Sequence, residues 1–418
     1  MDRRTFLKAA AAAGLAVAAP VATTKEALAA DTGLYDGPYW FFVLAQGGWC
    51  PTDLVDPKGN ANGVDSYNTG DIMTAGNINY APLEFQQQFF EAHYNRTLVI
   101  NGIDMSTNGH EQGRRYSFSG KLAEGHPALA ALIAAKAGPA LPMAFISNGG
   151  YDVTNGIIAP TRADSVDTLP KIAFSNKINA NGDAQFHSDY AMDRIRQAAQ
   201  NRLERQQQKI ALPHVRSAMS TLHTARVGEQ ELRDVLQYLP DNINGNSLQD
   251  QASVALASFR AGLGVSVNMR MGGFDTHGNH DARHFPRLAD LLRGVDFIWQ
   301  KAEEMNIADK VIVVVGSDFG RTPGYNGNNG KDHWSVNSMM VMSEPGNGIP
   351  TNTVIGKTTD GHKPMKVNPQ TLQPDENGVR IKPEHIHSAL RKLAGIEQDS
   401  FSLQFPLDVG QELPLLDE

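Results

Sequence analysis

The densest group of chemically active side chains in the sequence is GGFDTHGNH, which places Asp275, His277 and His280 within six residues, directly after the apolar run Val265–Met271. In an extended segment, side chains at positions i and i+2 point the same way, so Asp275 and His277 can converge on one ion, and a short turn can add His280. Carboxylate and imidazole groups bind zinc, manganese or iron, and asparagine-rich surroundings tolerate calcium. The segment therefore predicts a divalent metal site. The alternative is that these polar groups only satisfy the backbone of a turn.

A second group, GSDFGRTP, follows the most hydrophobic run of the chain, Val311–Val315. Asp318 stands where a strand is expected to end, which suits a metal ligand. The guanidinium of Arg321 is a planar fork of donors that suits a phosphate, sulfate or carboxylate. The alternative is an ion pair between the two residues that stiffens the loop.

A third group lies in GYNGNNGKDHW, a glycine- and asparagine-rich loop that ends in Asp332 and His333. The loop is not a Walker A motif, because Tyr325 replaces the required first glycine and Asp332 stands where serine or threonine should be. The loop therefore does not predict a nucleotide site, and Asp332 and His333 are candidates for other chemistry.

The chain has a single cysteine, Cys50, among 418 residues, so intramolecular disulfides, cysteine-rich zinc sites and iron–sulfur clusters are excluded. Any metal must use histidine and carboxylate ligands. Cys50 is a candidate nucleophile or ligand, and the alternative is a small buried hydrophobe. His110 lies in the polar segment NGHEQGRRYSFSG, which we interpret as a loop; it is a candidate general acid or anion contact.

The elements that must position these residues are short apolar runs, each of which ends in a glycine-rich turn. VIVVV shows no polar alternation, as expected for a strand that helices cover on both faces. Between the runs lie segments with helical patterns. This alternation predicts an α/β fold with a mainly parallel sheet and helices on both faces, whose turns converge at the carboxyl ends of the strands. The runs are Tyr39–Ala45, Thr97–Ile100, Met143–Ile146, Val265–Met271 and Val311–Val315, and the helical segments are Pro127–Lys136, 189–210, 217–239, 250–263, Phe285–Met305 and Pro383–Ala394.

Residues 30–418 are expected to form one large α/β domain. Residues 151–250 have weaker strand signals and more Gln, Asn and Arg, which predicts a helical insertion or cap; a solvated flank of the same domain is the alternative. The segment WSVNSMMVM after His333 predicts a further strand.

Residues 1–29 read as a removable signal peptide, with a charged start, an Ala-rich apolar run and a small-residue cleavage site. Arg3-Arg4 followed by TFLK resembles the twin-arginine signal, apart from Asp2; an ordinary Sec signal is the alternative. Pro20 interrupts an apolar run that is too short to span a bilayer, so no stable membrane anchor is expected. The predicted location is periplasmic or secreted, with the Tat export machinery as a partner. The net charge of −8 argues against nucleic-acid binding.

Together the twin-arginine start, GGWCPTDLVDPKG, GHEQGRRYSFSG, GGFDTHGNH, SDFGRTP and KDHW resemble the exported DUF1501-type family, which is related to alkaline phosphatases and sulfatases. The resemblance implies an alkaline-phosphatase-like fold with one or two divalent ions. It implies one metal site at Asp275, with His277 or His280 and His333, and a second site that includes Asp318. Phe319 departs from this pattern, because it stands where the superfamily has a histidine ligand. The sulfatase pattern Cys-x-Pro-x-Arg is absent at Cys50, so formylglycine is not expected.

We therefore predict an exported hydrolase of small anionic phosphate or sulfate esters that depends on a divalent metal ion (zinc, calcium or manganese). Cys50, His110 and Arg321 are the candidate catalytic residues. The metal-ligand candidates are Asp275, His277, His280, Asp318 and His333. Two alternatives stay open: an exported binding or envelope-assembly protein that keeps the fold without turnover, and an oxidoreductase with a histidine and carboxylate iron site.

Overall fold

The centre of the protein is an eight-stranded sheet with the order β12-β4-β11-β8-β1-β7-β5-β6. The computed structural model describes residues 34–162, 170, 173–179, 182–209, 229–239 and 247–417. Its strands are β1 Tyr39–Ala45, β4 Thr97–Asp104, β5 Met143–Ser147, β6 Pro160–Thr161, β7 Gly264–Met271, β8 Val311–Ser317, β11 Val336–Ser343 and β12 Thr353–Ile355. Two small hairpins pair β2 Met73–Ala75 with β3 Ile78–Tyr80, and β9 Gly320–Arg321 with β10 His333–Trp334.

The sheet is mainly parallel, as predicted. β1 lies between β7 and β8 and runs parallel to both, with Val43 opposite Met269 on one side and Val315 on the other. β11 is antiparallel to β4 and β8, because the chain enters it from the edge at which β8 ends. All five predicted apolar runs are strands, and the predicted run after His333 is β11.

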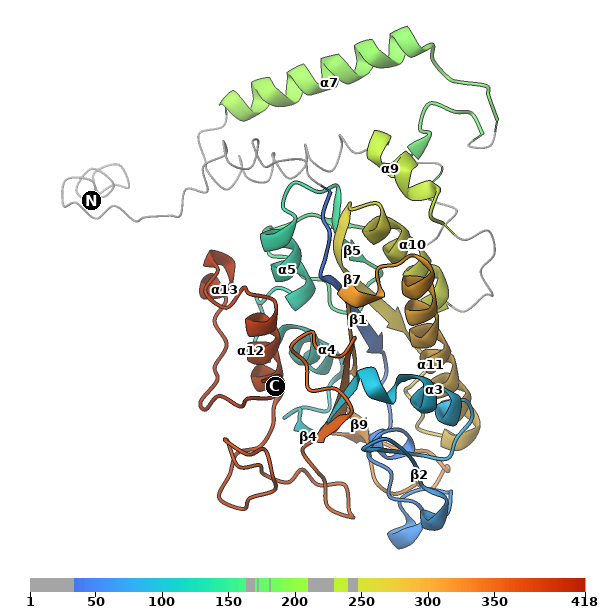
Figure 1. The fold of residues 1–418 in the computed structure, drawn as a ribbon, viewed down its shortest axis with the longest axis vertical. Coiled ribbons are helices and arrows are strands. Elements are labelled where there is room, and N and C mark those ends of the chain that lie inside the picture. The colour runs from blue at the N-terminus through green and yellow to red at the C-terminus, as the bar shows by residue number, and fades with distance from the viewer. Residues whose placement is uncertain are drawn as a thin grey trace, which may run out of the picture.

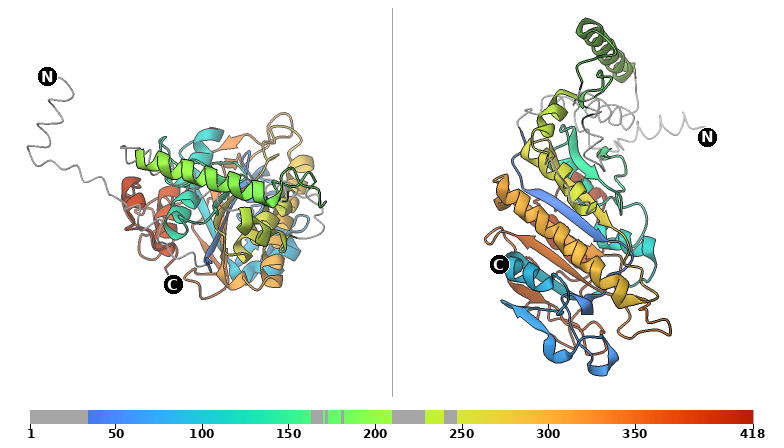
Figure 2. Two further views of the ribbon diagram at one scale, coloured as in Figure 1. Left: turned by 90° about the horizontal axis from the view of Figure 1, so that it is seen from above. Right: turned by 90° about the vertical axis from the view of Figure 1, so that its right-hand side faces the viewer.

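Helices cover both faces of the sheet (Figure 1). They are α3 Gln86–His93, α4 His110–Ser119, α5 Leu129–Ala137, α10 Ser247–Arg260, α11 His280–Glu304, α12 Pro383–Leu393 and α13 Ser400–Gln404. Figure 2 shows α10 and α11 side by side across one face. Short 3-10 turns occur at Pro51–Asp53, Ala61–Gly63, Thr69–Asp71, Tyr94–Arg96 and Ala308–Lys310.

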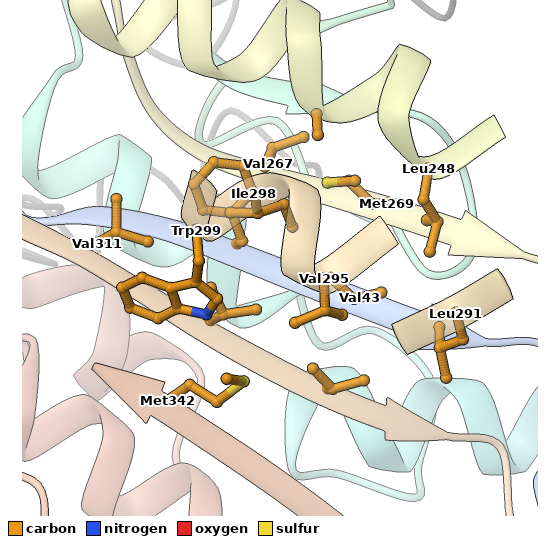
Figure 3. Close-up of a cluster of buried hydrophobic side chains, with 14 of the residues drawn as sticks. Val43, Leu248, Val267, Met269, Leu291, Val295, Ile298, Trp299, Val311 and Met342 are labelled. Atoms are coloured by element: carbon orange, nitrogen blue, oxygen red, sulfur yellow. The ribbon is translucent and has the colours of Figure 1, made fainter. Parts of the chain in front are cut away.

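The two faces of the central strand belong to two separate cores. Phe41 and Val43 pack with α10 and α11, whereas Trp40 and Phe42 belong to the core that includes α5 and α12. Successive side chains of a strand point to opposite faces, so an all-apolar strand supplies both cores at once. Figure 3 shows the first core, where Trp299 lies over the sheet. Burial of each such side chain contributes about 1.5–3 kcal/mol.

One predicted loop is a helix. His110 is the first residue of α4, not part of a loop; the helix begins after Gly109 and ends at Gly120, which has the left-handed conformation common at helix ends. The internal Gly113 obscures the helical pattern in the sequence. Glycine is needed at this position because α4 lies close to the backbone of Asp318: a Cβ on residue 113 would lie 2.3 Å from the carbonyl oxygen of Asp318. Tertiary packing therefore overrides the weak local helix signal.

The predicted signal peptide, residues 1–29, lies outside the described residues, as do residues 217–228 of one predicted helix. Within 151–250, the structure describes α7 Asp189–Lys209 and α9 Glu229–Leu236. α7 lies apart from the sheet and its covering helices (Figures 1 and 2). Among the described residues, no helix has the length and apolarity needed to cross a membrane.

Candidate metal centre

The carboxyl ends of β4, β7 and β8 deliver four polar side chains to one point at the edge of the sheet. We call His110, Asp275, His277 and His333 the rim cluster. His110 opens α4 after β4, Asp275 and His277 follow β7, and the β9–β10 hairpin after β8 carries His333 opposite Arg321. Parallel strands end at the same edge, so loops far apart in the sequence meet here. Three of the four residues, His110, Asp275 and His333, hold ligand atoms within 4.8 Å of one another.

The distances within the rim cluster are short. Asp275 Oδ1 lies 3.0 Å from His277 Nε2 and 3.1 Å from His333 Nε2, and Asp275 Oδ2 lies 3.6 Å from His110 Nε2. The Nε2 atoms of His277 and His333 are 3.0 Å apart. A tetrahedral zinc ion with bonds of about 2.0–2.1 Å would separate its ligand atoms by about 3.3 Å. The spacing of these atoms therefore fits an ion of that size.

The second nitrogen of each rim histidine is held by an oxygen acceptor. His110 Nδ1 lies 2.7 Å from Asp318 Oδ2, and His277 Nδ1 lies 2.7 Å from Asp332 Oδ1. His333 Nδ1 donates to the backbone carbonyl of Asn108 at 2.8 Å. Metal-bound histidines in proteins use this arrangement, because the outer hydrogen bond fixes the tautomer and turns Nε2 towards the metal.

These outer partners determine where the lone pairs point. A carbonyl oxygen can only accept, so His333 carries its proton on Nδ1, and when neutral it presents a bare Nε2 to His277 and Asp275. The same reasoning applies to His110 and His277 beside their carboxylates. Two Nε2 atoms 3.0 Å apart cannot both carry protons towards each other. The rim cluster is therefore a set of converging acceptors that a cation would satisfy.

Charges around the rim cluster keep Asp275 ionised. Burial pushes the pKa of Asp275 upwards, but the hydrogen bond from Arg321 and the charge of that guanidinium outweigh it and lower the pKa to about 2. The hydrogen bond to Asp318 raises the pKa of His110. Asp275 keeps 47% of its side chain exposed, so the cluster is open to solvent.

Arg321 is not a free anion-binding fork. Its side chain is fully buried, and its nitrogens donate to the carbonyls of Gly47, Gly48 and Lys331 and, at 2.7 Å, to Asp275. The predicted contact with a substrate anion would need donors that are already in use. Arg321 instead ties the loop after β1 to the metal-ligand candidate Asp275.

Asp318 does not point its oxygens at the rim cluster's centre. One oxygen accepts from His110 and the other accepts from the backbone N–H of Gly47 at 3.0 Å. Phe319 is buried, and its ring packs 4.8 Å from the imidazole of His110 and 4.4 Å from that of His333. Phe319 therefore offers no ligand for the second metal site that the resemblance implies. Asp318 holds the imidazole of the ligand candidate His110.

His280 lies in a different group from Asp275, contrary to the expectation that both bind one ion. A buried cluster beneath the rim consists of Cys50, Thr52, Asp53, Asp65, Thr276, His280, His284 and Lys331, all buried. Because α11 begins at His280, residues four apart share one helix face, and His280 and His284 stack inward with ring centres 4.3 Å apart.

The hydrogen bonds of the buried cluster form a directed chain. The backbone N–H of Cys50 donates to His284 Nε2 at 3.0 Å, so the proton of neutral His284 lies on Nδ1, which faces the hydroxyl of Thr276 at 3.2 Å. That hydroxyl donates to His280 Nδ1 at 2.7 Å, and His280 Nε2 donates to Asp53 at 2.7 Å. Every imidazole nitrogen in the chain thus has a defined role.

Lys331 supplies the positive charge of the buried cluster. Its ammonium group lies 2.8 Å from Asp65 and 4.0 Å from Asp53. Burial would lower the pKa of Lys331, but the neighbouring carboxylates outweigh it and raise that pKa above its usual value. Burial likewise opposes ionisation of Asp53, yet Lys331 and His280 hold its pKa well below the usual range. Cys50, Asp53 and His280 are close enough to form a second ligand set, but here an ammonium group already balances the carboxylates.

Cys50 is fully buried inside the protein, as in the alternative of a small buried side chain. Its thiol contacts the hydroxyl of Thr52 at 3.3 Å and Lys331 Nζ at 3.5 Å. Burial, together with the nearby Asp53, raises the pKa of Cys50 to about 12, so the reactive thiolate is scarce near neutral pH.

Several residues of both clusters were missed from the sequence: Asp332 as the partner of His277, and Asp65, His284 and Lys331 in the buried cluster. The spacing of His280 and His284, four residues apart before an amphipathic stretch, was a signal for a shared helix face. No local pattern marks Lys331, because its partners come from residues more than 200 positions away.

The fold and the site define an α/β protein with a candidate metal centre at the carboxyl edge of a mainly parallel sheet. The model of a family described as a protein of unknown function (DUF1501) matches residues 41–401, so the chain belongs to that family, as predicted. No curated protein matches the sequence significantly.

Solved structures with a similar fold include sulfatases and an alkaline phosphatase, the kinds of enzyme that the resemblance named. The complex of Ps i-CgsB with k-i-k-neocarrahexaose has 11% identity and a TM-score of 0.40, covering 86% of this chain and 72% of that one. The PsFucS1 sulfatase from Pseudoalteromonas sp. has 9% identity and a TM-score of 0.38, covering 93% and 72%. The TAB5 alkaline phosphatase with bound Mg has 9% identity and a TM-score of 0.36, covering 87% and 99%.

Proposed function

We propose that this protein is a metal-dependent hydrolase of phosphate or sulfate esters and that the rim cluster holds its divalent ion. The observation that carries the proposal is the convergence of the Nε2 atoms of His110, His277 and His333 on the carboxylate of Asp275, while an oxygen acceptor holds each Nδ1. Such outer hydrogen bonds are typical of histidines that bind metal.

The donor set favours zinc or manganese over calcium. Three imidazoles and one carboxylate suit borderline ions, whereas calcium prefers six to eight oxygen ligands. A divalent ion at this position supplies Lewis acidity, which polarises an ester oxygen and lowers the pKa of nearby water. Asp318 and Asp332 hold His110 and His277 in their tautomers, and Arg321 keeps Asp275 in place.

The nucleophile that we propose is water. In the described part of the chain, no hydrogen bond of a rim-cluster residue goes to the side chain of a serine, threonine or cysteine. Cys50 is buried in the other cluster. His110 is one-third exposed and held by Asp318 with its Nε2 towards Asp275, so we assign it to the ion and not to proton donation.

The test is to load the protein with zinc or manganese, measure bound metal and assay a broad panel of phosphate and sulfate esters. We expect turnover that His333→Ala removes together with the metal. Asp360→Asn, in an exposed turn, is the matched control and should keep both. A fully loaded protein with no turnover above background on any ester would refute the proposal.

A second candidate is an exported binding protein that holds an ion without turnover. It is favoured by the number of side chains in the rim cluster: four protein ligands complete a tetrahedral zinc site, whereas catalytic zinc sites keep one position open. X-ray absorption of the zinc-loaded protein separates the two candidates. Three histidines, a carboxylate and no additional oxygen favour the binding protein, and an additional oxygen favours the hydrolase.

The predicted twin-arginine export to the periplasm or outside the cell is part of the same proposal. It rests on the sequence of residues 1–29. Expression with Arg3 and Arg4 replaced by lysine should leave the protein in the cytoplasm, as fractionation followed by immunoblotting would reveal. Unchanged export would instead indicate the ordinary Sec route.

A further inference from the structure

A pocket of about 380 Å³ opens beside α4, the helix whose first residue is His110. One wall is α4, with Glu111, Arg114 and Arg115, and the other is the loop after β5, with Gly150 and Tyr151. The volume lies in the range of small-molecule sites. None of these residues was assigned a role from the sequence or in the rim cluster.

Both walls of the pocket are tied to the rim cluster. Arg114 lies one turn after His110 on α4, and its Nε donates to the backbone carbonyl of His110 at 3.2 Å. On the other side, Arg270 donates to the carbonyl of Asn148 and to the side chain of Gln46, whose own carbonyl accepts from the N–H of Phe274, the neighbour of Asp275. The first wall is therefore one helix turn from the rim residue His110, and the second is connected to the neighbour of Asp275 through Arg270 and Gln46.

Arg114 is the arginine of this pocket with donors to spare. Arg115 donates to the carbonyl of Leu122 at 2.9 Å and pairs with Glu124 at 3.4 Å. Arg114 uses its Nε on His110, and neither of its terminal nitrogens has a partner among the described residues. Its guanidinium is half-buried, unlike that of Arg321, whose donors are all engaged. The free end of Arg114 suits one anionic group, bound through two parallel hydrogen bonds.

The rest of the lining indicates what the anion is attached to. Val153 is the only aliphatic side chain among the lining residues, so most of the apolar surface belongs to the ring of Tyr151 and to carbon atoms of polar side chains and backbone. The carboxylate of Glu111 and the amide of Asn155 offer acceptors beside that ring, a mixture that suits a molecule with both hydroxyl groups and an apolar face. Hydroxyl groups can donate to such acceptors, and their burial is costly only when they stay unpaired.

Resting on the hydrolase function proposed above, we propose that the substrate is a phosphate or sulfate ester of a hydroxyl-rich, sugar-sized alcohol. The alcohol occupies the pocket between α4 and the loop after β5. Arg114 binds the ester's anionic group next to the rim cluster, the task that the sequence had suggested for Arg321.

Calorimetric titration of the zinc-loaded protein tests this assignment without any need for turnover. The probes are glucose 6-phosphate and glucose 6-sulfate, with hexyl phosphate and hexyl sulfate as esters of equal charge. We expect the sugar esters to bind at least about tenfold more tightly than the hexyl esters. Arg114→Gln should weaken sugar-ester binding by about tenfold or more, as expected for hydrogen bonds to a charged group. Equal affinities for the sugar and hexyl esters, or no binding of any ester, would overturn the proposal.

Three further variants distinguish a lost contact with the ester from misfolding. Arg114→Lys keeps the positive charge but loses the two parallel donors, so its affinity should lie between those of the wild type and Arg114→Gln. Arg260→Gln, at the opposite end of β7, should bind the esters as the wild type does. Val153→Trp should block the sugar esters while inorganic sulfate still binds. Turnover that does not depend on Arg114 would overturn this inference alone, whereas Arg114-dependent binding without turnover would overturn the hydrolase proposal alone.

Discussion

The rim cluster and the buried cluster both combine histidines with aspartates, yet they differ in where their protons lie. In the rim cluster, outer partners take each Nδ1 proton, and bare Nε2 atoms converge on Asp275. In the buried cluster, donors and acceptors alternate from the N–H of Cys50 to Asp53, and Lys331 provides the cation. The difference teaches that composition alone does not identify a metal site; the direction of each hydrogen bond does.

The largest expected effect concerns the cation of the buried cluster. Lys331→Met leaves the carboxylates of Asp53 and Asp65 buried without their ammonium partner, which should lower the free energy of unfolding by about 3–5 kcal/mol. Urea unfolding followed by circular dichroism measures the loss. Lys310→Met, at a half-exposed lysine paired with Asp36, is the control and should cost less than 1 kcal/mol. A similar small loss for Lys331→Met would mean that the buried cluster does not need its charge.

The next effect should fall on metal binding and not on folding. Asp275→Asn removes the carboxylate on which the rim histidines converge, so zinc affinity should fall by at least about a hundredfold. The amide can still accept a hydrogen bond from Arg321, but that buried guanidinium loses its carboxylate partner, so the metal-free variant should be less stable than wild type by clearly less than Lys331→Met, which strands two buried carboxylates. Competition with a chromogenic chelator measures the affinity. A large loss of stability in the absence of metal would erase the proposed distinction between the clusters.

A smaller effect tests the proton order of the buried cluster. Thr276→Val leaves His280 Nδ1 without its donor and His284 Nδ1 without its acceptor, which should cost about 1–3 kcal/mol of unfolding free energy. Thr276→Ser keeps the hydroxyl and should recover most of that loss. Nitrogen-15 NMR of the imidazoles should place the proton of His284 on Nδ1 and that of His280 on Nε2. Reversed tautomers would contradict the order of hydrogen bonds described for the buried cluster.

The smallest expected effect is the chemical labelling of Cys50 in the folded protein. Because burial raises the pKa of this thiol to about 12, iodoacetamide at pH 8 should leave the folded protein largely unlabelled, and unfolding in urea should allow complete labelling. Mass spectrometry of the intact protein gives the labelled fraction. Rapid labelling of the native protein would place the thiol at an accessible site and reopen its catalytic role.

The sequence predicted the sheet well because its strands are continuous apolar runs. β1 has the predicted bounds, Tyr39–Ala45, since both of its faces are buried and no polar residue interrupts the run. α4 was missed, because its helical state depends on the close packing of Gly113 against Asp318 and not on an apolar stripe. Local pattern thus reveals elements whose burial is uniform and misses those that tertiary contacts stabilise.

The site was predicted in part for a related reason. Asp275 and His333 come together as expected because both follow strands that end at one edge of the sheet. His280 was misplaced because α11 begins at His280 and directs that side chain inward. The partners of a polar residue come from distant segments, so the sequence reveals candidates for ligands more readily than it assigns them to a cluster.

The consecutive residues Lys331, Asp332 and His333 join the two clusters within one short stretch of chain. Lys331 pairs with Asp65 in the interior, Asp332 holds His277, and His333 contacts Asp275. An ion in the rim cluster would thereby also favour the docked position of Lys331, so loading and folding are thermodynamically linked. At a free ion concentration a hundred times the dissociation constant, this linkage adds about 2.7 kcal/mol to stability. A shift in melting temperature would therefore report occupancy of the centre before any substrate is known.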